Sequence, residues 1–197
     1  MIDLRSDLCT VPTEEMWEAM RAAELGWATY GEDALVNELC ALVAALLGKS
    51  AALWVPTCGM ANLVALLTFC EPDDPVVLES ASHVLTSEAM GIVEIAQLVP
   101  HSLWSEDGRM RPEDVDDLVA QTRAILLVLE NTHTRAGGTV LSVEQTEALA
   151  SAAKRHDCRV HVDGARLFNA AVALEVPLAA LAATANYTLS LHDALPI

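Results

Sequence analysis

A run of residues near position 160 places a carboxylate where a buried strand should end. Residues 160–163 alternate between apolar and polar side chains, and Gly164 then breaks the alternation, which predicts a strand followed by a turn. In an open parallel sheet, ligands bind at the carboxyl ends of the strands. Asp163 could therefore face a cationic ring nitrogen, a metal ion or a ribose, with Arg166 just beyond it. The alternative is a structural aspartate that caps the next helix or holds a turn.

Two other predicted strand ends carry groups that could do chemistry. Thr57-Cys58-Gly59 joins an apolar run to a helical pattern, and the free N–H groups at such a helix N-terminus suit a phosphate. This turn is neither a Walker loop nor a GxGxxG fingerprint, and it could be an ordinary tight turn. Glu130-Asn131-Thr132-His133 directly follows a continuous apolar run. Polar groups at such a position often belong to a site, although they could also cap a helix or hold a loop.

The histidines do not form a metal site by their spacing. His83 follows the predicted strand that ends at Glu79, and its imidazole could stack on a flat ring or play a structural part. We interpret His101, His156 and His161 as structural or surface residues. No two His or acidic residues share a compact ligand spacing, so we predict no metal.

The elements that must position these residues alternate along the chain. Apolar runs predict strands at 51–56, 76–79, 93–100, 124–130 and 159–163, and periodic or capped segments predict helices that begin at Thr13 and cover 35–47, 60–70, 112–121 and 142–156. Residues 26–33 are expected to form a loop. Strands that alternate with helices at short intervals are typical of βαβ units and a parallel sheet.

Composition limits the functional classes. The 197 residues suffice for one domain or slightly more, and 53% are hydrophobic but only 4% aromatic, which is a globular composition. A formal charge of −17 argues against non-specific nucleic-acid binding. Five scattered cysteines suggest reduced thiols in a cytoplasmic protein. The first residues lack a signal-peptide layout, and the most apolar tract, 170–185, contains Glu175 and Pro177, so we expect a soluble protein without a membrane partner.

Six separated motifs, taken together, resemble a known family. They are Asp3-Leu4-Arg5-Ser6-Asp7, Tyr30-Gly31-Glu32-Asp33, Leu47-Gly48-Lys49, Met60-Ala61-Asn62-Leu63, Glu130-Asn131-Thr132-His133 and residues 161–170. Their order and spacing are similar to those of the threonine aldolase / aromatic amino acid β-eliminating lyase family, from residue 1 to about 185. The resemblance implies an α/β fold, the incomplete large domain of the aspartate-aminotransferase-like pyridoxal-phosphate fold, with a mainly parallel sheet and helices on both faces.

The resemblance also implies a role for each matching residue. Asp163 would face the pyridinium nitrogen of pyridoxal 5'-phosphate and keep it protonated, and His83 would stack on the ring. The backbone of Thr57-Cys58-Gly59 would bind the phosphate. Arg166 would engage both the cofactor and the substrate carboxylate.

The remaining implied roles concern the substrate and a partner subunit. Ser6 would help to bind the substrate carboxylate, and His133 would lie near the substrate hydroxyl. Tyr30 would be a site tyrosine that could reach a partner in a homodimer or homotetramer. The implied reaction is retro-aldol cleavage of L-threonine or L-allo-threonine to glycine and acetaldehyde.

The chain departs from the family pattern at several places. Cys58-Gly59 replaces a hydroxyl-bearing phosphate turn, and Trp27-Ala28-Thr29 replaces a more acidic stretch. The Schiff-base lysine that the family carries downstream is missing, since Lys49 and Lys154 are the only lysines. We expect 1–185 to be a partial cofactor-binding large domain, 186–197 an aberrant tail, and the small C-terminal domain to be absent.

Three functional readings follow from this match and its gaps. The full-length parent would be a threonine-aldolase-like lyase, of which this fragment is inactive because it has no amine to bond the cofactor. The chain could instead be a non-catalytic cofactor-binding or oligomerisation module. A third possibility is a β-eliminating lyase that acts on another amino acid.

Overall fold

A five-stranded parallel sheet forms the centre of the molecule. The computed structural model describes the backbone of residues 6–189 and the side chains of residues 6–186. The strands are β1 (Pro75–Glu79), β2 (Val99–Leu103), β3 (Leu126–Glu130), β4 (Arg159–Asp163) and β5 (Tyr187–Leu189). Their order in the sheet is β2-β1-β3-β4-β5, and every neighbouring pair is parallel. The predicted α/β class with a parallel sheet is therefore confirmed.

Helices connect and cover the strands. The α-helices are α1 (Glu14–Ala22), α2 (Ala34–Leu47), α3 (Cys58–Phe69), α4 (His83–Thr86), α5 (Pro112–Thr122), α6 (Val143–Lys154), α7 (Leu167–Leu174) and α8 (Leu178–Ala182). Short 3-10 turns form η1 (Asp7–Cys9) and η2 (Ala28–Tyr30), and a π-helical segment forms η3 (Met90–Ile95). No helix within residues 6–189 has both the length and the apolar character needed to cross a membrane.

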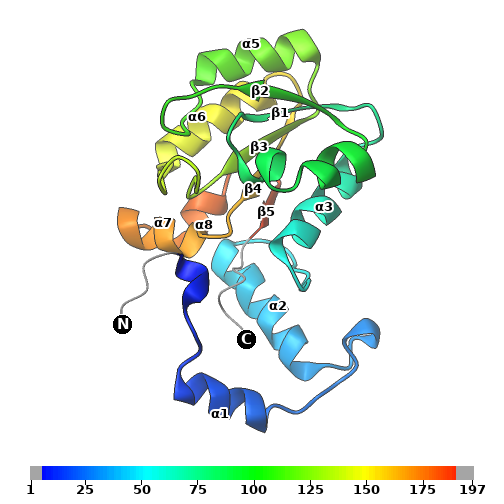
Figure 1. Cartoon of the computed structure of the whole chain (residues 1–197), viewed down its shortest axis with the longest axis vertical. Coiled ribbons are helices and arrows are strands. Elements are labelled where there is room, and N and C mark those ends of the chain that lie inside the picture. Colours follow the sequence, from blue (N-terminus) through cyan, green and yellow to red (C-terminus); the bar gives the residue numbers. More distant parts are fainter. Residues whose placement is uncertain (1–5, 190–197) are drawn as a thin grey trace.

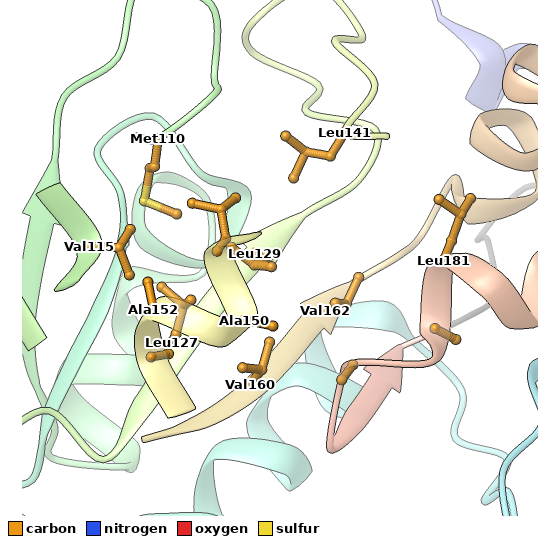
Figure 2. Packing of buried hydrophobic residues seen from close by; sticks show 14 of the residues in the cluster. Met110, Val115, Leu127, Leu129, Leu141, Ala150, Ala152, Val160, Val162 and Leu181 are labelled. Atoms are coloured by element: carbon orange, nitrogen blue, oxygen red, sulfur yellow. The ribbon is translucent and has the colours of Figure 1, made fainter. Parts of the chain in front are cut away.

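Each face of the sheet packs into its own apolar cluster. On one face, side chains of β3 and β4 pack with those of α5, α6 and α8, as Figure 2 shows for Leu127, Leu129, Val160, Val162 and their helical partners. On the other face, the alternate strand residues Val76, Leu78, Leu126 and Val128 pack with residues of α3, α4 and η3. Because strand side chains alternate between faces, this arrangement fixes the direction of every polar residue in β3 and β4.

Local signals in the sequence account for the helix ends. Thr13 caps α1 by accepting the N–H of Met16, and Ser142 and Gln145 form a complete capping box on α6. Gly48 ends α2 in the left-handed conformation, with φ of 64°, which costs glycine little. These boundaries lie where the sequence predicted them.

Two predicted strands differ from the structure. Residues 51–56 form no strand, and Leu53 and Trp54 are exposed; an apolar run becomes a strand only if another strand pairs with its backbone. The strand predicted at 93–100 begins only at Val99. The preceding segment is helical because Ile92 and Ala96, four residues apart, both point into the core.

The sheet also continues past the domain boundary predicted at residue 185. Asn186 binds the backbone of Val160 through both its N–H and its side-chain oxygen, and β5 then pairs with β4. Residues 186–189 therefore continue the sheet by pairing with β4, and the aberrant tail stays a prediction. The rest of that predicted tail, 190–197, lies outside the described residues.

The N-terminal segment forms an arm that runs away from the sheet. Figure 1 shows α1 and the loop that follows it apart from the strands, and η1, α1 and η2 contain no buried residue. Several large apolar side chains of this arm are exposed, among them Leu25, Trp27 and Tyr30. The arm is joined to the body through α2, whose residues Val43 and Leu47 enter the core.

Candidate active site at the carboxyl edge of the sheet

Two carboxylates end adjacent strands on the same face of the sheet. Glu130 of β3 lies opposite Asp163 of β4 in the parallel register. Val160 and Val162 pack toward α6, so the alternate residues His161 and Asp163 point to the opposite face, toward α3. The predicted strand-end position of Asp163 is confirmed.

The carboxyl group of Asp163 is buried, and hydrogen bonding only partly offsets the cost of burying its charge. Its side chain accepts a hydrogen bond from Nδ2 of Asn62 at 3.1 Å, and the residue is 4% exposed. Burial, with a further contribution from the negative charge of Glu130, raises the pKa of Asp163 to about 6. A cationic group next to this carboxylate would therefore be stabilised, as a protonated ring nitrogen would be.

Asn62 connects Asp163 to His83, although only its place in a family motif drew attention to it in the sequence. Its Nδ2 lies 3.2 Å from Oε2 of Glu88, and Oε1 of Glu88 lies 3.0 Å from Nδ1 of His83. Asn62 is buried on α3 four residues before buried Leu66. A polar residue on the core-facing side of an apolar helix is a signal that could have identified it.

His161, interpreted from the sequence as a structural or surface residue, is buried and belongs to this group. Its Nε2 lies 2.9 Å from Oδ1 of Asn62. Burial lowers the pKa of His161 to about 4, so the imidazole is neutral at neutral pH. The sequence did not reveal this role because the partner of His161 comes from a helix distant in the chain.

The predicted phosphate turn lies next to the same group. Thr57 is the N-cap of α3, and its Oγ1 accepts the N–H of Met60 at 3.1 Å. A Cβ added to Gly59 would lie 3.5 Å from the carboxyl group of Glu88. The turn 57–59 and Glu88, which pairs with His83, are therefore neighbours at the N-terminus of α3, the positive end of its dipole.

The N-terminal segment brings a carboxylate to Arg166. The Nε of Arg166 lies 2.6 Å from Oδ2 of Asp7, and its Nη2 lies 3.1 Å from Oδ1 of the same residue. Nη1 donates to Oγ1 of Thr134 at 2.9 Å. Ser6 is adjacent, and its Oγ accepts the N–H of Leu8. Ser6 and Arg166 are linked through Asp7, whose Oδ1 also accepts the hydroxyl of Ser6 at 3.4 Å, and their shared role toward the substrate carboxylate stays a prediction.

Glu130 holds the two loops that flank the site. It accepts the backbone N–H of His83 at 2.7 Å through one carboxyl oxygen and that of Thr134 at 2.8 Å through the other. His83 follows β1 and Thr134 follows β3, so this carboxylate fixes the relative position of both loops.

His133 and Tyr30 do not join the group around Asp163. The imidazole of His133 is 1% exposed, and its Nε2 lies 3.0 Å from Oε2 of Glu79. Glu79 follows Leu78 in β1, and Leu78 packs on the α3 face, so Glu79 points to the other face. Tyr30 is 69% exposed and packs edge-on against Trp27, with 4.8 Å between ring centroids.

Both lysines are engaged far from this edge. Nζ of Lys49 donates to the carbonyl oxygens of Ala182 and Ala185, and Nζ of Lys154 donates to that of Thr184. Neither ammonium group therefore faces the site. Within the described part of the chain, no three His, Cys, Asp or Glu side chains are arranged to hold a metal ion.

Comparison with known proteins assigns the chain to a family. The model of the beta-eliminating lyase family matches residues 3–190. The chain belongs to this family. Low-specificity L-threonine aldolase 1 of Arabidopsis thaliana is 39% identical over 94% of the chain. The low specificity L-threonine aldolase of Escherichia coli strain K12 is 40% identical over 88% of it.

These matches cover only part of each relative. The chain corresponds to 54% of the Arabidopsis protein and 53% of the E. coli protein, so it spans about half the length of the curated relatives it matches. Among solved structures, a threonine aldolase of Leishmania major superposes with a TM-score of 0.80 at 20% identity, over 92% of this chain and 56% of that one. An alanine–glyoxylate aminotransferase of Nostoc sp. gives 0.68 at 17% identity, over 90% and 46%. The fold of this chain is thus that of the aminotransferases, as the family resemblance implied.

Proposed function

We propose that the carboxyl edge of the sheet binds pyridoxal 5'-phosphate. Asp163 would hold a proton on the ring nitrogen and His83 would contact the ring. The backbone at 57–59 would bind the phosphate at the N-terminus of α3. The observation that carries the proposal is the buried carboxyl of Asp163, whose pKa is raised to about 6 and which gains from a cationic neighbour.

The proposed reaction of the full-length parent is retro-aldol cleavage of L-threonine or L-allo-threonine to glycine and acetaldehyde. The names of relatives at 39% and 40% identity support this substrate class. Bound pyridoxal phosphate supplies an electron sink for the pair released as the Cα–Cβ bond breaks. A base must also take the proton of the β-hydroxyl group.

The chain's own residues would bind and orient the substrate. Arg166 and Ser6 would hold its carboxylate, for which a guanidinium fork is suited, once Asp7 yields part of the guanidinium that it now occupies. His133 stays a predicted neighbour of the substrate hydroxyl. In the present arrangement its imidazole is paired with Glu79 instead.

We further propose that this chain alone binds the cofactor without turnover. The amines of Lys49 and Lys154 are held by main-chain carbonyls of residues 182–185, so neither supplies the nucleophile for covalent attachment. This feature favours the non-catalytic module as the second candidate function. Amino-acid analysis of the purified chain with threonine and pyridoxal phosphate should detect no glycine above the protein-free control.

A stable adduct tests the site without requiring a covalent bond between the chain and the cofactor. N-(5'-phosphopyridoxyl)-L-threonine carries the phosphate, ring, carboxylate and β-hydroxyl in one molecule, and the corresponding 2-aminobutyrate adduct lacks only the hydroxyl. In calorimetric titrations of the 197-residue chain, we expect the threonine adduct to bind roughly tenfold more tightly. A site built to hydrogen-bond a hydroxyl group loses that bond with the adduct that lacks it.

The other results distinguish the alternatives. Equal affinity for both adducts would favour a β-eliminating lyase for another amino acid or a simple cofactor-binding module. Absence of binding by pyridoxal phosphate and by both adducts would overturn the proposal.

We also propose that the full-length parent is a homodimer or homotetramer. The exposed apolar residues of the N-terminal arm, including Leu25, Trp27 and Tyr30, support this because a second subunit would remove them from water. Tyr30 could then reach the site of that partner.

A further inference from the structure

The amide of Asn62 contacts three ionisable side chains that converge from different elements. Asp163 and His161 come from β4, and Glu88 follows α4. The contacts measure 3.1 Å to Asp163, 2.9 Å to His161 and 3.2 Å to the nearer oxygen of Glu88. Asn62 itself is 0% exposed, so no solvent can replace these bonds.

Only one orientation of this amide satisfies its neighbours. Two of the three groups are carboxylates, which accept hydrogen bonds, so the NH₂ group must face Asp163 and Glu88. The oxygen of Asn62 then faces His161, which must donate from Nε2. The neutral imidazole consequently carries its proton on Nε2, and its Nδ1 is buried without a hydrogen-bond partner in the part of the chain that the structure describes.

The same amide is connected to both side chains proposed to touch the cofactor ring. One N–H bonds Asp163, the proposed partner of the ring nitrogen. The other bonds Glu88, whose Oε1 lies 3.0 Å from Nδ1 of His83, the proposed contact of the ring face. Asn62 therefore links Asp163, proposed to lie at the ring nitrogen, to His83, proposed to lie against the ring face, with Glu88 between Asn62 and His83.

We propose that Asn62 is a positioning residue, which holds the ionised carboxylate of Asp163 toward the ring nitrogen and, through Glu88, fixes the imidazole of His83. This inference rests on the proposed cofactor site and deepens it. The hydrogen bond from Asn62 lowers the pKa of Asp163 against the larger opposite effect of burial. The amide thus keeps the carboxylate charged in a buried place.

Two substitutions in the full 197-residue chain test this. Asn62→Leu removes both donors at nearly the same volume, and Asn62→Asp keeps the shape while it replaces the donors by a third carboxyl group. Asn37→Leu is the matched control, because Asn37 is an exposed asparagine in α2 whose Nδ2 donates to the carbonyl oxygen of Gly31.

The first measurement needs no cofactor. Carbon-detected NMR titration follows the Asp163 carboxyl and the His83 ring in the labelled chain. In both Asn62 variants we expect the Asp163 midpoint to move up by roughly half a pH unit or more and the His83 resonances to shift, since a charge-assisted hydrogen bond is lost. A merely structural asparagine would leave both signals unchanged.

The second measurement is the affinity for pyridoxal phosphate at neutral pH. Loss of a hydrogen bond to a charged group corresponds to a roughly tenfold weaker affinity, and Asn37→Leu should bind as the unchanged chain does. Unchanged titration and unchanged affinity in both Asn62 variants would overturn the inference while the cofactor site survives. If the unsubstituted chain binds no pyridoxal phosphate, the proposed function fails, and the titration alone decides whether Asn62 positions Asp163 and His83.

Discussion

The ionisation of Asp163 is controlled by the residues around it and not by its own chemistry. Burial raises its pKa most strongly, Glu130 adds to that effect, and the hydrogen bond from Asn62 opposes it. The resulting pKa of about 6 lies well above the ordinary value of 3.8. A chain without cofactor therefore carries an unfavourable charge at neutral pH, which a cationic ligand would offset.

We predict that Asp163→Asn stabilises the cofactor-free chain at pH 7.5. The raised pKa means that ionisation of Asp163 costs the folded state up to ~3 kcal/mol above pH 6, and that this cost disappears as pH falls from about 6 to below the unfolded value. The unfolding temperature of the variant should exceed that of the unchanged chain by several degrees at pH 7.5 and match it near pH 3.5.

Scanning calorimetry at the two pH values makes this measurement, with Asp117→Asn as a control at an exposed position. The variant should also lose affinity for pyridoxal phosphate. Equal unfolding temperatures at pH 7.5 would contradict the raised pKa.

A second residue-scale prediction concerns Arg166. Arg166→Lys should weaken binding of the phosphopyridoxyl-threonine adduct by roughly tenfold or more, since an ammonium group cannot reproduce the bidentate fork. Binding of pyridoxal phosphate itself should change far less, because it has no carboxylate. Fluorescence titration with both ligands gives the ratio of the two losses in affinity. The control is Arg135→Lys, which alters an exposed arginine bonded to Ser87. A uniform loss for both ligands would assign Arg166 to the cofactor alone.

At the scale of elements, similar capping chemistry has different consequences in different helices. α6 begins with a complete capping box and buries Leu149, Ala150 and Ala152 against the sheet. α1 begins with a capping threonine but buries nothing. The stability of α6 is thus coupled to that of the core, whereas α1 can unfold without exposing core residues.

We therefore predict different outcomes for removal of the two caps. Ser142→Ala should lower the free energy of unfolding by about 1 kcal/mol, the usual cost of a lost N-cap. Thr13→Ala should leave the global unfolding midpoint unchanged and only reduce local helix content. Urea titration followed by circular dichroism measures the first effect, and hydrogen exchange of the α1 amides measures the second. A shift of the global midpoint in Thr13→Ala would mean that the arm is packed in solution.

At the scale of the whole molecule, the apolar arm and the polar edge lie on separate parts of the chain. Figure 1 shows η1 beside the body near α7, while α1 and the following loop run outward. The ion pair between Asp7 and Arg166 ties the start of this arm to the candidate site. Any contact that covers the arm would therefore be coupled to the position of Arg166.

We predict that the chain self-associates through this arm at micromolar concentration. Leu25 is 91% exposed and Trp27 is 62% exposed, and apolar side chains gathered in this way favour association. Light scattering after size exclusion should give more than one chain per particle, and Leu25→Glu should shift the population toward monomer. Val172→Glu, at an exposed apolar position on α7, is the matched control. The same mass distribution for both variants would exclude the arm as the interface.

The sequence by itself determined the features that depend on neighbouring residues and on order along the chain. Alternation, capping residues and glycines located α1, α2, α5, α6 and the strands that end at Asp163 and Glu130, because these signals act within a few residues. The ordered motifs identified the family. Local patterns failed at 51–56 and 93–100, where pairing and packing with distant segments decide between strand, helix and loop.

Only the tertiary structure decided which side chains meet. Asn62 and His161 became part of the site because α3 packs across the face of β4, a contact between residues about a hundred positions apart, and Glu88 joins them from the segment after α4. In the same way, the tertiary structure paired His133 with Glu79 and both lysines with residues 182–185. The direction and charge of a side chain depend on burial and on partners that the fold brings from elsewhere, and neither can be read from the spacing of residues along the chain.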